Sequence, residues 1–330
     1  MKTREDFVNY FKEHDKIRVI DAHQSKVHSV AWNCDGRFLA SGSFDKTVSV
    51  LQLENGYKLT RDHTCRGHTE QVDQICWHKT NPDLLASAGG DKTVRVWDVR
   101  SRKNVATIST KGEVFSSENI NIAWSPDRNT IAVGNKHDLV SFIDARTYKV
   151  GATEQFKTET NELTWNTTGN LFFAVNGAGQ IHVLSWPDLK MLLTLQAHTS
   201  NAICIDFDPT GRHFAVGSTD CLVSIWDAKW LACVRMMDRL DWSGRAVSFS
   251  HDGRLLACGS EDLVIDIGDV DSGRRVAELK CEAATFSLAW HPKTYLLAFS
   301  CDDKVASSTY GRPEREAGTV KLYGLTSDQV

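Results

Sequence analysis

The chain has 330 residues, of which 41% are hydrophobic and 24% are charged, and it contains 22 glycines and 6 prolines. These proportions exclude disordered and collagen-like chains, and the length is sufficient to bury a large core. The 38 Lys and Arg residues nearly balance the 42 Asp and Glu residues, and the resulting net charge of −4 disfavours nucleic-acid binding through bulk positive charge.

The sequence shows no targeting or membrane-spanning pattern. Residues 1–20 are charged throughout and lack the apolar core of a secretory signal. The longest apolar runs, such as residues 191–195, are far shorter than the roughly 18 residues that a membrane-spanning helix needs. We therefore expect a soluble intracellular protein that has no membrane partner.

A short helix and a strand are predicted at the start of the chain. Residues 5–14 place Phe7, Val8 and Phe11 on one face of a helix, and Ile17–Ile20 has the character of a strand. We assign residues 1–16 to an N-terminal extension that contains this short helix.

A repeat runs through the rest of the chain. In each unit, the second strand is apolar and ends in small residues, such as Leu39–Ser43. A tight turn that often contains Asp follows, and then a third strand, such as Thr93–Asp98. Turn residues about every 8–12 positions between such runs are typical of short β-strands. The first strand of each unit ends in an aromatic residue, and these recur at steps of 45, 47, 41, 42, 42 and 41 residues, at Trp32, Trp77, Trp124, Trp165, Phe207, Phe249 and Trp290.

Four short strands in a unit of about 43 residues, repeated seven times, are typical of an all-β, seven-bladed WD40 β-propeller. One repeat cannot bury both faces of its sheet, so we expect a single domain at residues 17–325, followed by a tail at 326–330. The strand Ile17–Ile20 is well placed to close the ring by joining the last blade beside Thr319–Tyr323. That pairing would also cover two exposed sheet edges.

Three polar residues of the second repeat suggest a catalytic triad, namely His68, Ser87 and Asp91. The repeat pattern places them differently, in the loop before the innermost strand, on the second strand and in the following turn. Asp91 can then accept a hydrogen bond from one imidazole nitrogen, and Ser87 can donate to the other while it accepts from the indole of Trp97. These bonds would satisfy polar groups whose unpaired burial costs about 1–3 kcal/mol each.

The same pattern recurs in part at His198, Asp220 and Trp226, although Val216 stands where a serine is expected. A repeated constellation favours an architectural role over catalysis. We therefore interpret both groups as structural tetrads and predict no catalytic residue.

Other signals for chemistry are weak. The nine cysteines include no Cys-x-x-Cys pair, which disfavours a zinc or redox site. The segment Ala88–Thr93 resembles a phosphate-binding loop, but it aligns with Ser41–Thr47 and is therefore a turn between strands. The innermost strands consist of Val, Ile, Leu, Ala and aromatic residues, with no acidic cluster towards the axis, which disfavours a propeller enzyme. We predict no metal, no cofactor and no small-molecule substrate.

Departures from the repeat identify candidate partner-binding residues, because aromatic and Arg side chains dominate interface energetics. Phe44 occupies the middle of a turn that holds glycine in the next blade, and Trp242 lies between Arg239 and Arg245 just before the sixth blade. Alternatively, Phe44 folds against a neighbouring turn and Trp242 caps a blade. Two longer segments also depart from the pattern, at residues 111–119 and in the polar insertion 303–318, which contains Ser307 and Ser308.

Several loop segments, whose identity the fold does not dictate, resemble the THO complex subunit 3 family from Ala22 to Leu325. One departure from the family pattern is the insertion Val114–Glu118, which affects only what this loop contacts. The segments that carry the resemblance are Ala22–Trp32, Ser41–Thr47, Asn81–Asp83, Arg239–Trp242, Ser248–Gly253, Ala289–Lys293, Cys301–Lys304 and Arg315–Lys321.

The resemblance implies a nuclear, non-catalytic WD40 scaffold subunit of the THO/TREX assembly, which couples transcription to mRNA packaging and export. It implies docking to the large helical THO subunits, with an RNA-helicase-type ATPase and export adaptors in the wider complex. We expect direct RNA contact to be indirect or weak, because the net charge is negative and no aromatic–basic stripe is present. The alternative is a WD40 adaptor of another nuclear complex, either a ubiquitin-ligase substrate receptor or a chromatin reader.

Overall fold

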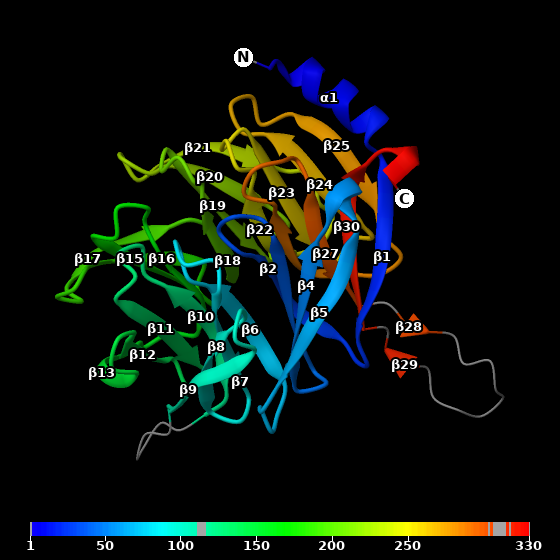
Figure 1. The fold of residues 1–330 in the computed structure, drawn as a ribbon. Helices are drawn as coiled ribbons and strands as arrows, with labels where there is room; N and C mark the ends of the chain where they lie inside the picture. Colours follow the sequence, from blue (N-terminus) through cyan, green and yellow to red (C-terminus); the bar gives the residue numbers. More distant parts are fainter. Residues whose placement is uncertain (1, 111–116, 303, 306–314, 317, 330) are drawn as a thin grey trace.

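The computed structural model describes residues 2–110, 117–302, 304–305, 315–316 and 318–329. The part of the predicted insertion at residues 114–116, and Ser307 and Ser308, lie outside the described residues. Within the described residues the chain forms seven four-stranded antiparallel sheets, the blades, set around a central axis (Figure 1). The predicted seven-bladed, all-β propeller is confirmed.

Each of the first six blades uses four consecutive strands, ordered from the axis outwards. Blade 1 contains β2 (Val27–Trp32), β3 (Phe38–Ser43), β4 (Thr47–Leu53) and β5 (Leu59–Arg66), with a short 3-10 helix at Asn55–Tyr57. Blade 2 contains β6 (Val72–Trp77), β7 (Leu84–Gly89), β8 (Thr93–Asp98) and β9 (Lys103–Ser109). Blade 3 contains β10 (Asn119–Trp124), β11 (Thr130–Asn135), β12 (Leu139–Asp144) and β13 (Lys149–Gln155).

Blade 4 contains β14 (Thr160–Trp165), β15 (Leu171–Asn176), β16 (Gln180–Ser185) and β17 (Met191–Gln196). Blade 5 contains β18 (Ala202–Phe207), β19 (His213–Ser218), β20 (Val223–Asp227) and β21 (Ala232–Met237). Blade 6 contains β22 (Gly244–Phe249), β23 (Leu255–Ser260), β24 (Val264–Asp269) and β25 (Arg275–Lys280).

Blade 7 joins the two ends of the chain, in the order β26, β27, β30 and β1 from the axis outwards. These strands are β26 (Thr285–Trp290), β27 (Leu297–Cys301), β30 (Gly318–Leu325) and β1 (Lys16–His23). In the antiparallel pair of β1 and β30, Ile17 faces Tyr323 and Ile20 faces Val320. The ring is therefore closed by the predicted strand. A two-stranded pair, β28 (Lys304–Val305) with β29 (Arg315–Glu316), and a 3-10 helix at Ser327–Gln329 complete the elements.

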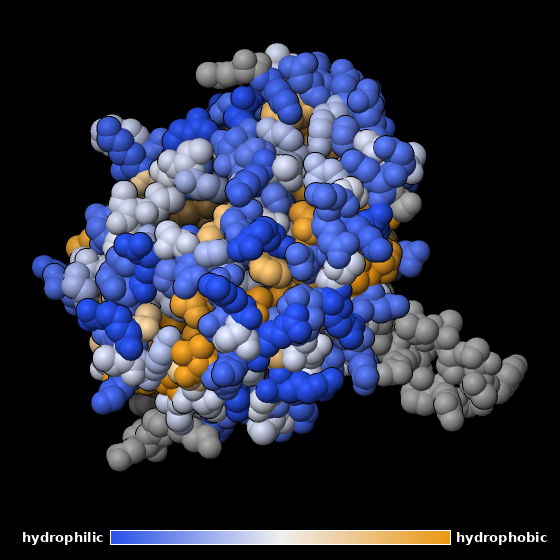
Figure 2. All heavy atoms as spheres, in the orientation of Figure 1, coloured by the Kyte–Doolittle hydropathy of each residue, from blue (hydrophilic) through white to orange (hydrophobic). Residues whose placement is uncertain are grey.

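The second strand of each blade is enclosed by the neighbouring blades, and this burial explains its small and apolar residues. In β3 and in β19, every residue after the first is buried. Close approach restricts side-chain size here, because a Cβ atom on Gly42 would lie 2.8 Å from Val72 of the next blade. Polar residues face outwards, and the view in Figure 2 is largely hydrophilic, with apolar side chains gathered in its recesses.

The N-terminal helix α1 (Arg4–Glu13) packs against blades 6 and 7. A capping box formed by Thr3 and Asp6 starts the helix. Phe7 and Phe11 are buried, with ring centroids 5.3 Å from Tyr295 and 5.7 Å from Tyr323, respectively. The helix therefore extends the hydrophobic core of the joint at which the chain ends meet.

Substitution of Phe11 by Ala should destabilise the protein by about 3–5 kcal/mol, because it removes a buried ring and leaves a cavity beside β30. Urea denaturation monitored by Trp fluorescence measures this change. Val19→Ala on β1, where the side chain is 56% exposed, is the matched control and should change stability by less than about 0.5 kcal/mol. Equal stability of Phe11→Ala and the unmodified chain would contradict a structural role for the helix.

Candidate docking face

Four side chains of blade 2 form one hydrogen-bonded cluster. The imidazole of His68 places Nδ1 3.0 Å from Asp91 Oδ2 and Nε2 2.8 Å from Ser87 Oγ. The indole N–H of Trp97 donates to Ser87 Oγ over 2.9 Å. Ser87 is fully buried, and His68 and Trp97 are nearly so. This geometry favours the architectural interpretation, because the serine hydroxyl is enclosed and already engaged on both sides.

Blade 5 builds a similar cluster with a serine that sequence reasoning missed. His198 Nδ1 lies 3.1 Å from Asp220 Oδ1, and its Nε2 lies 2.8 Å from Ser224 Oγ. Trp226 donates its indole N–H to the same hydroxyl over 2.8 Å. The serine therefore comes from β20 and not from the position of Val216 on β19. The sequence carried a signal for this serine, because Ser224 and Trp226 are two residues apart in one strand and therefore share a face.

Blade 1 has a third cluster that the sequence analysis did not identify. His23 Nδ1 lies 3.0 Å from Asp45 Oδ2, and its Nε2 lies 2.8 Å from Ser41 Oγ. Leu51 stands at the position of the tryptophan, since it faces Leu39 just as Trp97 faces Leu85. The separation of His and Asp would have revealed the cluster, because it is 22 residues in blades 1 and 5 and 23 in blade 2.

These clusters hold the loops and turns on one side of the ring, which we call the top face. Asp91 also accepts hydrogen bonds from the backbone N–H groups of Thr69 and Thr93, each over 3.0 Å. Burial acts to raise the pKa of Asp91, but the hydrogen bonds from His68 and Thr93 outweigh it and lower that pKa well below its usual range. The top-face loops of these blades are therefore fixed to their sheets.

Phe44 and Trp242, two of the four candidate partner-binding residues, are exposed on the top face. Phe44 is 51% exposed and its ring stacks on that of His28, with 5.5 Å between the centroids. Trp242 is 61% exposed, and its backbone N–H donates to Asp262 Oδ2 over 3.1 Å. The two aromatic residues belong to blades 1 and 6, so blade 7 lies between them.

The two arginines beside Trp242 have partners within the chain. Arg239 donates to both oxygens of the buried Asp266 and to the carbonyl of Gly273, which directs it into blade 6 and away from the surface. Arg245 on β22 forms an ion pair with Glu261. Sequence reasoning missed a further apolar side chain nearby, Leu263, which is 54% exposed in the turn between β23 and β24.

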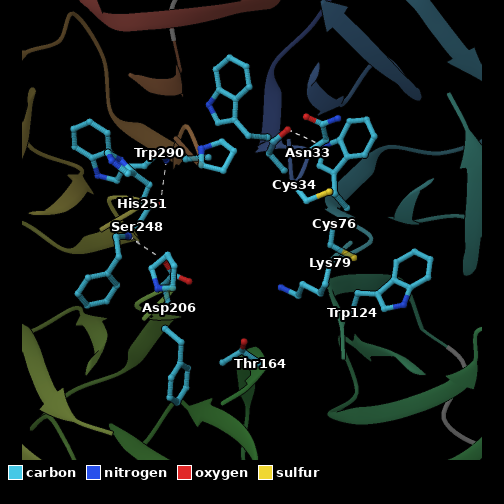
Figure 3. A pocket seen from close by; sticks show the side chains of 18 of the residues that line it. Asn33, Cys34, Cys76, Lys79, Trp124, Thr164, Asp206, Ser248, His251 and Trp290 are labelled. Atoms are coloured by element: carbon cyan, nitrogen blue, oxygen red, sulfur yellow. Dashed lines mark hydrogen bonds between the residues drawn. The ribbon is translucent and has the colours of Figure 1, made fainter. Parts of the chain in front are cut away.

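The central channel is lined by the innermost strands. The sequence predicts no acidic cluster repeated towards the axis, but single acidic residues of blades 2, 4 and 5, namely Asp73, Glu162 and Asp206, line the channel. Its two connected parts have volumes of about 340 and 620 Å³. In Figure 3, Lys79 extends towards the opening, whereas the rings of Trp124 and Trp290 point away from it into the blades. No group of three or more potential metal-binding side chains occurs among the described residues.

Burial in the channel wall raises the pKa of Asp73 to about 7, of Glu162 to about 7 and of Asp206 to about 6. Glu162 accepts a hydrogen bond from Gln74 Nε2 over 2.8 Å, which joins blades 2 and 4 across the channel. Oδ2 of Asp73 is buried without a hydrogen-bond partner. Charge on Asp73 is therefore poorly compensated at neutral pH.

The blade pattern and the His–Ser–Asp–Trp clusters define the class of protein, a seven-bladed WD40 β-propeller. A family model described as the THOC3 beta-propeller domain matches residues 23–300. The chain belongs to the THO complex subunit 3 family. Among the described residues, no helix has the length and apolar character needed to cross a membrane.

Two curated proteins illustrate the similarity. THO complex subunit 3 of Arabidopsis thaliana is 44% identical over 311 residues, which cover 94% of this chain and 96% of that protein. WD repeat-containing protein AAC3 of Dictyostelium discoideum is 34% identical over 302 residues, which cover 84% of this chain and 62% of that protein. The full-length match to the Arabidopsis protein supports the family assignment most strongly.

Substitution of Asp91 by Ala should destabilise the protein by about 2–3 kcal/mol at pH 7, because the His68 and backbone donors lose a charged acceptor. A carboxyl whose folded pKa is lowered stabilises the fold above its unfolded pKa, so the difference should shrink as the pH falls below about 4. Denaturation at pH 7 and about pH 2.5 tests both statements. Asp188→Ala, an exposed position, is the control; a difference of equal size at both pH values would contradict the linkage.

Asp73 should show the opposite pH dependence. Between about pH 4 and about pH 7 the folded chain retains a proton that the unfolded chain has released, so this residue lowers stability as the pH rises. Asp73→Asn should therefore stabilise the protein by about 1–2 kcal/mol at pH 8 and change it little near pH 4. Urea titrations at the two pH values, with Asp188→Asn as control, measure this effect. Destabilisation by Asp73→Asn at pH 8 would contradict it.

Proposed function

We propose that the chain is a non-catalytic WD40 scaffold subunit of the THO complex, within the wider TREX assembly. In this role it supports co-transcriptional assembly of messenger ribonucleoprotein and nuclear mRNA export through protein–protein docking. The observation that carries the proposal is the 44% identity to THO complex subunit 3 over 94% of the chain. A nuclear location is part of the same proposal.

A scaffold role agrees with the geometry of the polar clusters. Ser87 and His68 have the residue types of a hydrolase, but both are buried and engaged with Trp97 and Asp91. Their hydrogen bonds instead fix the top-face loops. A ring with fixed loops can present side chains to a partner with little loss of conformational entropy on binding.

We propose that the large helical THO subunits are the direct partners and that the top face carries some of the docking. Phe44 and Trp242 support this assignment, because exposed aromatic side chains on a rigid scaffold are typical interface anchors. The RNA-helicase-type ATPase and the export adaptor would be reached through the complex. The net charge of −4 supports an RNA contact that is indirect or weak.

Affinity purification of the tagged chain from nuclease-treated nuclear extract tests the proposal. We expect near-stoichiometric recovery of the large THO subunits, identified by mass spectrometry. Phe44→Ala and Trp242→Ala should each reduce recovery at least about fivefold, in line with the loss of an interface anchor. Their melting temperatures should stay unchanged, because both side chains are exposed.

Trp230→Ala is the matched control, because Trp230 is 73% exposed but lies in the turn between β20 and β21, on the opposite face of the ring. Recovery should be unaffected by this substitution. Recovery of ubiquitin-ligase or chromatin components in place of THO subunits would overturn the proposed function. Unchanged recovery with both top-face variants would remove the assignment of the docking face.

A further inference from the structure

Blade 6 presents two exposed apolar side chains on neighbouring loops of the top face. Trp242 lies in the loop that leads into β22, and Leu263 lies in the turn between β23 and β24. Asp262, which precedes Leu263, accepts hydrogen bonds from the backbone N–H groups of Asp241 and Trp242 over 2.8 and 3.1 Å. The two loops are therefore tied together, and we call this surface, Trp242 and Leu263 with Asp238, Asp241 and Asp262, the blade 6 patch.

The blade 6 patch is held rigidly. The thiol of Cys221 in blade 5 donates to the carbonyl of Asp241 over 3.3 Å, and the backbone N–H of Cys281 donates to the carbonyl of Leu263 over 2.8 Å. Neither apolar side chain is covered, since their exposed fractions are 61% and 54%. Fixed loops that leave large apolar groups in water are typical of a preformed binding surface.

The charge around these apolar groups is negative. Among the described residues, none of Asp238, Asp241 and Asp262 forms an ion pair with Lys or Arg. The nearby arginines pair with other carboxylates: Arg245 with Glu261, and Arg239 with Asp266, which also pairs with Arg275 beside Glu278. Burial raises the pKa of Cys221, and the neighbouring carboxylates, Asp262 foremost, raise it further. The carboxylates of Asp238, Asp241 and Asp262 thus outnumber the one exposed lysine next to the patch, Lys280, which lies opposite Val264, and the potential around the two apolar anchors is negative.

We propose that the blade 6 patch docks a basic amphipathic segment of a partner protein. Apolar side chains of that segment contact Trp242 and Leu263, and its Lys or Arg side chains face Asp238 and Asp241. Charge complementarity selects this occupant, because an acidic segment or a nucleic-acid backbone would be repelled by the same carboxylates. The inference rests on the proposed function and adds to it the chemistry of the docked segment.

The probe for the test is a fluorescein-labelled 18-residue helical peptide with Leu on one face and Lys on the other. Two further peptides serve as controls, one with Glu in place of Lys and one with Ser in place of Leu. Fluorescence anisotropy with the full chain should show binding of the Leu/Lys peptide only. Trp242→Ala and Leu263→Ala should each weaken this binding at least about tenfold, whereas Trp230→Ala should leave it unchanged.

Asp238→Asn and Asp241→Asn test the charge. Each should weaken binding of the Leu/Lys peptide about threefold at about 50 mM salt and by less at about 300 mM, because salt screens exposed charges. Asp262 is left intact, since it holds the loop. Equal binding of the Leu/Glu peptide, equal binding of the Ser/Lys peptide, or unchanged affinity after both apolar substitutions would overturn the proposal.

The same variants in the nuclear purification separate this inference from the proposed function. Loss of THO subunits with both Trp242→Ala and Asp241→Asn supports the docking of a basic segment. Loss with Trp242→Ala but not with Asp238→Asn or Asp241→Asn, together with no binding of the Leu/Lys peptide, would keep the proposed function and overturn the basic-segment chemistry. Binding of the peptide at Trp242 without recovery of any THO subunit would support the patch and overturn the proposed function.

Discussion

The packing of each blade against the next is the interaction on which the rest of the structure depends. A single four-stranded sheet has two apolar faces, and only its neighbours can cover them. This constraint sets the composition of the second strands, in which Gly42 and its counterpart Gly259 leave no room for a Cβ atom beside Val72 and Thr285. It also moves sequence variation to the loops, where the surface chemistry of this chain is concentrated.

The fold could be predicted because its signals are local and repeated. The aromatic residues at the ends of the inner strands predict the number of blades. The strand-like segments Ile17–Ile20 and Thr319–Tyr323 predict that the ring is closed by their pairing. The channel was harder to predict. Asp206 could have been placed there, because it precedes the buried Phe207 and adjacent residues in a strand face opposite ways. Glu162 could have been placed in the same way, because it precedes the buried Leu163. Asp73 could not, because it lies within a register irregularity between Val72 and Gln74 that no residue pattern indicates.

For the candidate docking residues, too, the sequence predicts features that depend on local position but not contacts between distant segments. Exposure of Phe44 and Trp242 was predictable from the turn positions, since a bulky residue at the tip of a tight turn has little to pack against. The direction of Arg239 was not, because its partner Asp266 lies 27 residues further along the chain and on another strand. Leu263 resembles an ordinary strand residue in the sequence. Only the register of β24 shows that this leucine precedes the strand and faces solvent.

The closure of the ring by β1 has a consequence for how the chain is made. The partner of Ile17 is Tyr323, so β1, which precedes the other propeller strands in the chain, cannot pair before β30 of the last blade has been made. Until then, β1 and helix α1 lack the strand and the aromatic residues that they contact in the finished protein. Synthesis therefore produces a set of stacked blades first, and the pairing of β1 with β30 forms last. A ribosome that stops early would release an open array with a bare strand edge, which is the type of surface that chaperones and degradation pathways recognise.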